Sequence, residues 1–168
     1  MFSDEQIRRY LEDALKAAEK ALELGNYPIG SVFTDGENEI IEMNECSTLD
    51  DVTAHAEILG MRKLGSKILK DTPNEYYLFT SLEPCFGCSF YVARTNVKHI
   101  YSALKDPHKG GTSDLKSQEQ FRSFFKNIEL INEPFEDLKE KSRELMQKYF
   151  LNKGRKDAAV FYGYKESA

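Results

Sequence analysis

The sequence has few cysteines, no tryptophan and no long apolar run. Three cysteines stand among 168 residues, and two of them share one Cys-x-x-Cys segment. So few cysteines argue against a disulfide framework and favour a reducing compartment. No apolar stretch approaches the ~20 residues of a membrane-spanning helix, and the first residues lack the basic start and apolar run of a signal peptide. We therefore expect a cytoplasmic protein without a membrane association.

A surplus of positive charge is also missing. The chain has 23 Lys and Arg against 28 Asp and Glu, a net charge of −5. This balance argues against a surface that attracts nucleic acid as a whole, although it leaves a local basic patch open. The length suits one domain with a core and is too short for two. We expect a single domain over residues 1–168, with its core at about 5–155 and a C-terminal segment, 156–168, of open role.

Apolar periodicity and turn signals predict alternating helices and strands. Helices are predicted at 3–25, 55–64, 84–95, 115–126 and 134–150. Strands are predicted at 29–34, 39–43, 76–80, 98–103 and 128–131. The first two strands read as an antiparallel hairpin, whereas the later order of strand, helix and strand implies a parallel crossover. The predicted fold class is therefore a three-layer α/β/α arrangement around a mixed five-stranded sheet.

Two short motifs carry the strongest functional signal. His55-Ala56-Glu57 is followed by Pro84-Cys85-Phe86-Gly87-Cys88, with 26 residues between Glu57 and Pro84. A catalytic zinc site needs three protein ligands, an open position for water and a proton carrier beside that water. We predict one Zn²⁺ per chain, bound by His55, Cys85 and Cys88, with Glu57 as the catalytic proton carrier.

The spacing within each motif places these groups at helix starts. Cys85 and Cys88 are three residues apart, so both thiols fall on one side of a first helical turn. The positive end of the helix dipole there favours thiolates, the form that binds zinc. His55 and Glu57 are about 200° apart around an ideal helix, so they can approach one another only beyond its open end. Two helix N-termini are thus predicted to face one metal ion.

A His-x-Glu motif followed by Pro-Cys-x-x-Cys is the signature of zinc nucleobase deaminases. On these motifs the chain resembles the cytidine-deaminase-like superfamily, within the branch of tRNA adenosine deaminases, guanine deaminases and small cytosine deaminases. The resemblance extends to Pro28-Ile29-Gly30 and to Asn44, and covers roughly residues 5–155. It implies a homodimeric hydrolase that replaces the exocyclic amino group of a nucleobase or nucleoside by a carbonyl and releases ammonia.

The same resemblance implies a set of substrate contacts. The Ala56 backbone N–H and the carbonyls up to Glu83 would meet the edge of the base, and the Asn44 amide would read another position. Phe86 and Phe150 are candidates to line or cover the ring, with a place in the hydrophobic core as the alternative for each.

Two other interpretations of the motifs lack support in the sequence. A structural zinc would need a fourth ligand, and the available residues, Cys46, His99 and His108, have no spacing that indicates one. A redox Cys-x-x-Cys would leave His55-Ala56-Glu57 unexplained. A catalytically silent, zinc-stabilised binding subunit is a third alternative, and the intact Glu57 speaks against it.

The motifs are compatible with two classes of substrate, a small molecule and tRNA. A tRNA adenosine deaminase, which makes inosine at the wobble position of the anticodon loop, is indicated by the loop 106–110 and by Tyr149-Phe150. However, Asn44-Glu45-Cys46 replaces the Asn-Arg-Pro of that family, and the basic run after Phe150 is diluted in 151–155. Because phosphate contacts dominate nucleic-acid affinity, these losses favour a small-molecule nucleobase or nucleoside. The sequence does not distinguish among adenine, guanine and cytosine derivatives.

Overall fold

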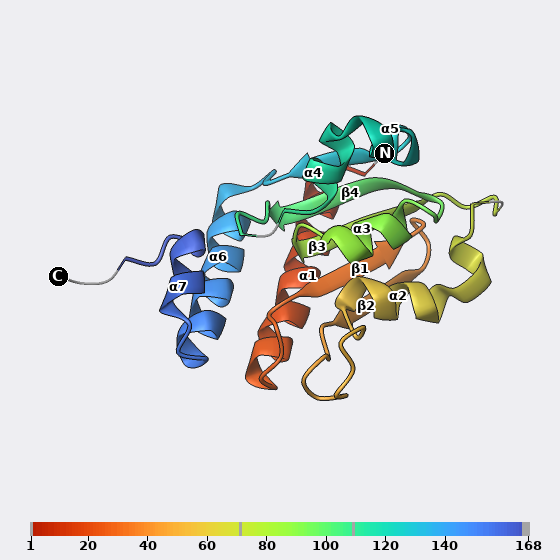
Figure 1. The fold of residues 1–168 in the computed structure, drawn as a ribbon. Helices are drawn as coiled ribbons and strands as arrows, with labels where there is room; N and C mark the ends of the chain where they lie inside the picture. The colour runs from red at the N-terminus through yellow and green to blue at the C-terminus, as the bar shows by residue number, and fades with distance from the viewer. Residues whose placement is uncertain (1, 71, 109, 166–168) are drawn as a thin grey trace.

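The computed structural model describes residues 2–70, 72–108 and 110–165 (Figure 1). Lys109 of the 106–110 loop and residues 166–168 of the expected C-terminal segment lie outside the described residues. The strands are β1 (Gly30–Thr34), β2 (Glu39–Met43), β3 (Tyr76–Leu82), β4 (Val97–Leu104) and β5 (Glu129–Asn132). The helices are α1 (Asp4–Glu23), α2 (Ala56–Leu64), α3 (Phe86–Val92), α4 (Thr112–Ser117), α5 (Glu119–Phe125), α6 (Glu136–Asn152) and α7 (Lys156–Ala159). Two 3₁₀ turns, η1 (Gly65–Ile68) and η2 (Val160–Tyr162), follow α2 and α7.

The five strands form one mixed sheet in the order β2-β1-β3-β4-β5. β1 is antiparallel to both of its neighbours, β2 and β3, whereas β3, β4 and β5 run parallel to one another. The predicted hairpin and the predicted parallel crossover are both confirmed. Because β3 and β4 are parallel neighbours, the residues that follow them emerge at the same edge of the sheet, where open α/β sheets commonly bind ligands.

Helices cover both faces of the sheet, which confirms the three-layer prediction (Figure 1). The alternation of side chains along a strand separates the two cores. Val32 and Phe79 pack with α1 and α6 on one face, while Phe33 and Leu78 pack with α2, α3 and α5 on the other. α1 approaches β1 so closely that a Cβ at Gly30 would lie 2.1 Å from the Ala14 carbonyl oxygen.

Two parts of the chain differ from the sequence prediction, and a third is one whose role the sequence left open. The helix predicted at 115–126 is two helices, α4 and α5, because Gln118 is extended (φ −85°, ψ 129°). Ser117 donates its hydroxyl to the Asp114 carbonyl there, in competition with the helical bonds. α3 begins at Phe86 and not at Pro84, so Cys85 is its N-cap. In the described part of the C-terminal segment, 156–165, α7 and η2 pack on α6. Within the described ranges, no helix is long and apolar enough to cross a membrane.

Candidate metal centre

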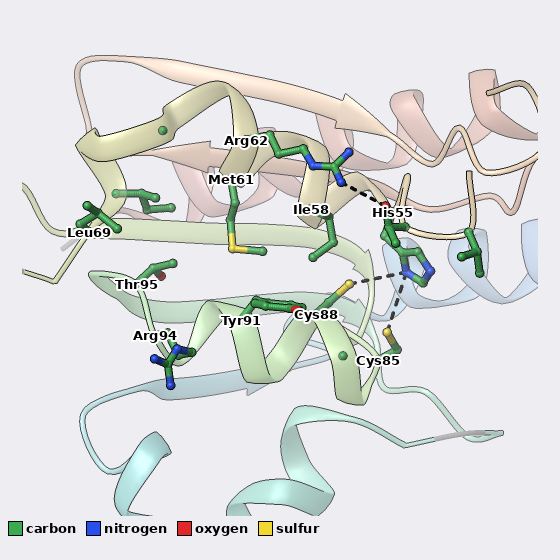
Figure 2. Close-up of a pocket in the computed structure, with 15 residues that line it drawn as sticks. His55, Ile58, Met61, Arg62, Leu69, Cys85, Cys88, Tyr91, Arg94 and Thr95 are labelled. Carbon is green, nitrogen blue, oxygen red and sulfur yellow. Dashed lines mark hydrogen bonds between the residues drawn. The ribbon is translucent and has the colours of Figure 1, made fainter. Parts of the chain in front are cut away.

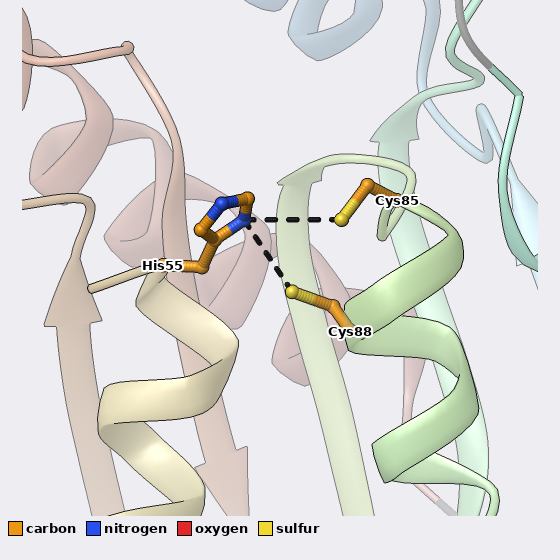
Figure 3. A group of neighbouring side chains, drawn as sticks. All are labelled: His55, Cys85 and Cys88. Atoms are coloured by element: carbon orange, nitrogen blue, oxygen red, sulfur yellow. Dashed lines mark hydrogen bonds between the residues drawn. The ribbon is translucent and has the colours of Figure 1, made fainter. Parts of the chain in front are cut away.

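Two helix N-termini bring the predicted ligands together. His55 is the N-cap of α2, and Cys85 is the N-cap of α3, each in an extended conformation. Cys88 follows within the first turn of α3 and is buried. Figure 3 shows the imidazole directed at both sulfur atoms across the gap between the two helices. The predicted meeting of two helix starts is therefore present in the structure.

The distances between the donor atoms fit a tetrahedral zinc ion. His55 Nδ1 lies 3.5 Å from Cys88 Sγ and 3.8 Å from Cys85 Sγ. The three donor atoms all lie within 4.8 Å of one another. Zinc–sulfur bonds of ~2.3 Å and zinc–nitrogen bonds of ~2.0 Å at a tetrahedral ion separate nitrogen from sulfur by about 3.5 Å and the two sulfurs by about 3.8 Å. The side chains thus need little rearrangement to bind the metal.

The protonation of the two thiols also suits metal binding. The hydrogen bond from Cys88 is the main cause that lowers the pKa of the Cys85 thiol to about 4. The same bond, together with burial, raises the pKa of the Cys88 thiol. A hydrogen bond with Cys85 raises the pKa of His55. The metal-free site therefore holds protons that a bound cation would displace, as expected for a thiolate and imidazole ligand set.

Glu57 lies beside these ligands without being one of them. The carboxyl group is buried, and Glu57 Oε2 lies 3.5 Å from Cys88 Sγ. Burial is the main cause that raises the pKa of Glu57, and the charge of Cys85 adds to it. A buried carboxyl group beside a metal site is placed to accept and return a proton.

No fourth protein ligand completes the group in the part of the chain that the structure describes. Cys46 contacts the Asn44 amide at 3.5 Å and lies 3.7 Å from the Val52 carbonyl oxygen. His99 pairs with Glu129 at 3.0 Å on the opposite side of the sheet from α2 and stacks on Tyr77. Three protein ligands with one open position are typical of a catalytic zinc site and not of a structural one.

The predicted substrate contacts divide into two groups. Asn44 and Ala56 are buried, Asn44 at the end of β2 and Ala56 at the first position of α2 beside His55. Glu83 is also buried, immediately after β3. Phe86 is 45% exposed at the start of α3, whereas Phe150 is packed in the core formed by α6 and the C-terminal segment.

A groove that no sequence pattern indicates leads away from the metal ligands. It has a volume of about 730 Å³ and runs between α2 and α3 (Figure 2). Met61 from α2 and Tyr91 from α3 lie on opposite sides of it. Its lining joins two helices that are distant in the sequence, so no local motif could indicate it. Tyr91 is 58% exposed, which is unusual for a large aromatic side chain.

The donor set, its open position and the sheet around it define a zinc hydrolase of the α/β class. Residues 4–104 match the family model described as the cytidine and deoxycytidylate deaminase zinc-binding region, and the chain belongs to this family. It is accordingly a zinc-dependent deaminase, a hydrolase that acts on the C–N bond of a nucleobase or nucleoside amino group.

Known proteins support this assignment at different levels. A tRNA-specific adenosine deaminase of Aquifex aeolicus is 37% identical over 111 residues, which cover 62% of this chain and 70% of that protein. A structure from a study of A-to-I editing by tRNA:A34 deaminases is 29% identical, with a TM-score of 0.65, and the match covers 82% of this chain and 99% of that one. The guanine deaminase of Nitrosomonas europaea has a TM-score of 0.66 at 17% identity, covering 83% and 82%, and shares the fold.

Proposed function

We propose that this deaminase acts on a free nucleobase or nucleoside and not on a base within RNA. The observation that carries this proposal is the charge of the loop 45–53, which leads from Asn44 to His55. It contains Glu45, Asp50 and Asp51 and no Lys or Arg. Arg62 of α2 pairs with Asp51 at 3.7 Å, whereas Glu45 and Asp50 have no ion pair among the described residues. The carboxylates of Glu45 and Asp50 repel the phosphates that provide most of the affinity of RNA-binding proteins, and a neutral base or nucleoside meets no such penalty.

The cations at the end of α6 support the same proposal, because they are engaged within the protein. Arg155 forms two hydrogen bonds with the Asp157 carboxylate, at 2.9 and 2.8 Å. The Lys153 ammonium lies over the Tyr149 ring, 5.7 Å from its centroid. A phosphate would have to compete with these partners. The few basic residues in 151–155 therefore have less positive charge available for RNA phosphates than the composition of this segment indicates.

The chemistry follows from the position of Glu57. A zinc ion bound by His55, Cys85 and Cys88 supplies activation of water at neutral pH. Glu57 removes one water proton, transfers it to a ring nitrogen and then delivers the second proton to the departing amine. Water thus provides the new carbonyl oxygen, its two protons end on the ring and on ammonia, and the C–N bond breaks.

The free thiol ligands require a reducing environment, so we propose the cytoplasm as the compartment.

Deamination of adenosine in tRNA is the second candidate. The name of the Aquifex aeolicus relative favours it, as does the study that describes the tRNA:A34 deaminase structure. For this candidate, the acidic loop 45–53 would have to lie away from the RNA backbone, or a second chain would have to supply the missing cations.

We also propose that the chain forms a homodimer through the groove between α2 and α3. Val52 is 84% exposed and Tyr91 58% exposed along this groove, which begins at the metal ligands. A contiguous exposed apolar surface indicates a protein interface, and a second copy seated there would exclude water from the edge of the site. Sedimentation should give a dimer for the wild type and a monomer for Tyr91→Glu. A monomeric wild-type protein would refute the dimer.

A substrate panel tests the proposed substrate class. Zinc-loaded protein is incubated with free bases, nucleosides, nucleotides and an adenosine-bearing anticodon stem-loop, with Glu57→Ala as the inactive control, and ammonia release is followed. We expect turnover of a free compound with little dependence on salt. Turnover of the stem-loop alone, with a rate that falls steeply with salt, would establish the RNA substrate in its place.

A further inference from the structure

Two buried carboxylates lie where the parallel strands β3 and β4 end. Glu83 is 2% exposed and Asp106 is 9% exposed. Burying a charged group costs free energy unless the group is hydrogen-bonded. Neither carboxylate forms an ion pair with a Lys or Arg within the described ranges 2–70, 72–108 and 110–165. Their charges are therefore stabilised by hydrogen-bond donors.

The donors connect the two carboxylates to one another and to the C-terminal segment. Glu83 Oε1 accepts from both the backbone N–H and the hydroxyl of Ser113, each at 2.6 Å, and Glu83 Oε2 accepts from the Asp106 N–H at 3.3 Å. Asp106 Oδ1 accepts from the His108 N–H and from the Tyr162 hydroxyl, both at 2.9 Å. Among the described residues, Tyr162 is the side-chain donor to Asp106. Hydrogen bonds to a charged acceptor are about twice as strong as neutral ones.

Tyr162 is held in place by the packing of the C-terminal segment on α6. Its ring is 2% exposed and stacks on Phe150, with centroids 5.7 Å apart. Gln147 on α6 donates its side-chain amide to the Tyr162 carbonyl. Burial raises the pKa of the Tyr162 phenol, and the Asp106 charge adds to the rise. The hydroxyl group therefore stays protonated, as a donor, at neutral pH.

The other end of this network is the turn that carries a metal ligand. Glu83 is followed by Pro84 and Cys85, and the Glu83 N–H donates to the Leu104 carbonyl at 2.8 Å. A Cβ at Gly111 would lie 1.9 Å from the Pro84 carbonyl oxygen, so the chain after Asp106 packs directly on the turn. We propose that Tyr162 is a positioning residue whose hydroxyl, through Asp106 and Glu83, fixes the turn that carries Cys85. Tyr162 of the C-terminal segment then acts on the metal site through Asp106 and Glu83, without contacting the metal ligands.

Replacement of one hydroxyl group tests this role. The inference uses the proposed function only for the choice of assay substrate. Tyr162→Phe removes the bond to Asp106 and keeps the ring. The matched control is Tyr164→Phe, since Tyr164 packs against the same cluster and its hydroxyl has no hydrogen bond among the residues the structure describes. Well below the melting temperature, we expect Tyr162→Phe to lower kcat by about 5- to 30-fold, with KM within twofold, because a hydrogen bond to a charge is lost. Tyr164→Phe should leave both unchanged.

A double-mutant cycle separates positioning from simple stabilisation. In an Asp106→Asn background the acceptor is neutral, so Tyr162→Phe should cost less kcat than it does in the wild type. Equal costs in both backgrounds would overturn the path through Asp106. A wild-type kcat in Tyr162→Phe, whatever its melting temperature, would overturn the positioning role, as would an equal loss in Tyr164→Phe.

A substrate-independent measurement keeps the inference distinct from the proposed function. If no compound of the panel is turned over, the proposed substrate class fails, and the positioning role is then decided by zinc transfer to a chromogenic chelator. We expect a half-time several-fold shorter in Tyr162→Phe than in the wild type and unchanged in Tyr164→Phe. Identical half-times in all three proteins would overturn the inference.

Discussion

The metal-binding region, residues 4–104, and the C-terminal region, residues 105–165, contribute to the same edge of the sheet by different means. In the first, each ligand stands at a helix start, and His55 and Cys85 are both N-caps. In the second, the contact with the site depends on Tyr162 and Asp106, which are 56 residues apart. The comparison indicates that short motifs carry the chemistry, whereas long-range packing shapes the surroundings in which it occurs.

Removal of a metal ligand from the first region should give the largest loss of zinc and of turnover, and it tests most directly whether this region carries the chemistry. Cys85→Ala leaves two protein ligands, so we expect the loss of bound zinc and of all measurable turnover. Zinc content per chain and ammonia release provide the measurements. Cys46→Ala is the matched control for zinc content, because Cys46 contacts Asn44 and not the metal group. A Cys85→Ala protein that retains one zinc per chain would show that the ligand set is wrong.

Removal of Glu57, the proposed proton carrier, should separate metal binding from catalysis. Glu57→Ala keeps all three ligands, so zinc should stay bound at one per chain. Turnover should fall by ~100- to 10,000-fold, the usual contribution of a positioned acid and base. The two readouts are metal content and kcat on the same preparation. Retained turnover would contradict the assignment of Glu57 as the proton carrier.

The two regions meet where Gly111 packs on the Pro84 carbonyl, and this contact should be sensitive to one added methyl group. In Gly111→Ala the added Cβ would meet the Pro84 carbonyl oxygen at 1.9 Å, and backbone must shift to relieve the contact. We expect a loss of about 1–3 kcal/mol of unfolding free energy, as for other overpacked sites. Gly87→Ala is the control, since no atom lies within 4 Å of the Cβ it would add. Thermal unfolding of both variants measures the difference, and equal melting temperatures would contradict the close packing.

An exposed ion pair in the C-terminal region should have the smallest effect. The bond to Arg155 is the main cause that lowers the pKa of Asp157 to about 2, from an ordinary value of 3.8. Because the folded pKa is depressed, the contribution of this pair is present above pH 4 and is lost as the pH falls toward 2. Asp157→Asn should lower the melting temperature at pH 7 by at most about 2–4 °C, since exposed pairs contribute little. The difference from the wild type should vanish near pH 2, and a difference that grows on acidification would have the wrong sign.

The sequence predicted the parts of the molecule that depend on local pattern. The five strands, the hairpin between β1 and β2, and the meeting of His55, Cys85 and Cys88 are all confirmed by the structure. These features follow from apolar alternation, from turn residues and from ligand spacing, each of which acts over a few residues.

The sequence did not predict features that require distant residues to meet. Gln118 breaks the helix expected at 115–126 through a local side-chain bond at Ser117, which competes with helical propensity. The bond from Tyr162 to Asp106 and the groove between α2 and α3 exist only once the sheet has brought their elements together. The polar pattern Asp106-Pro107-His108 indicates a loop, and no residue in it identifies Tyr162 as the partner.

Zinc titration of the metal-free protein tests the central claim, a catalytic zinc on His55, Cys85 and Cys88, most directly. Ammonia release from a substrate identified by the panel is measured after each addition of zinc. The account predicts no turnover without metal and a linear rise to a plateau at one zinc per chain, with Glu57→Ala binding the same amount of zinc without a comparable rise. Turnover by the metal-free protein, or full zinc occupancy with Glu57→Ala as active as the wild type, would contradict it.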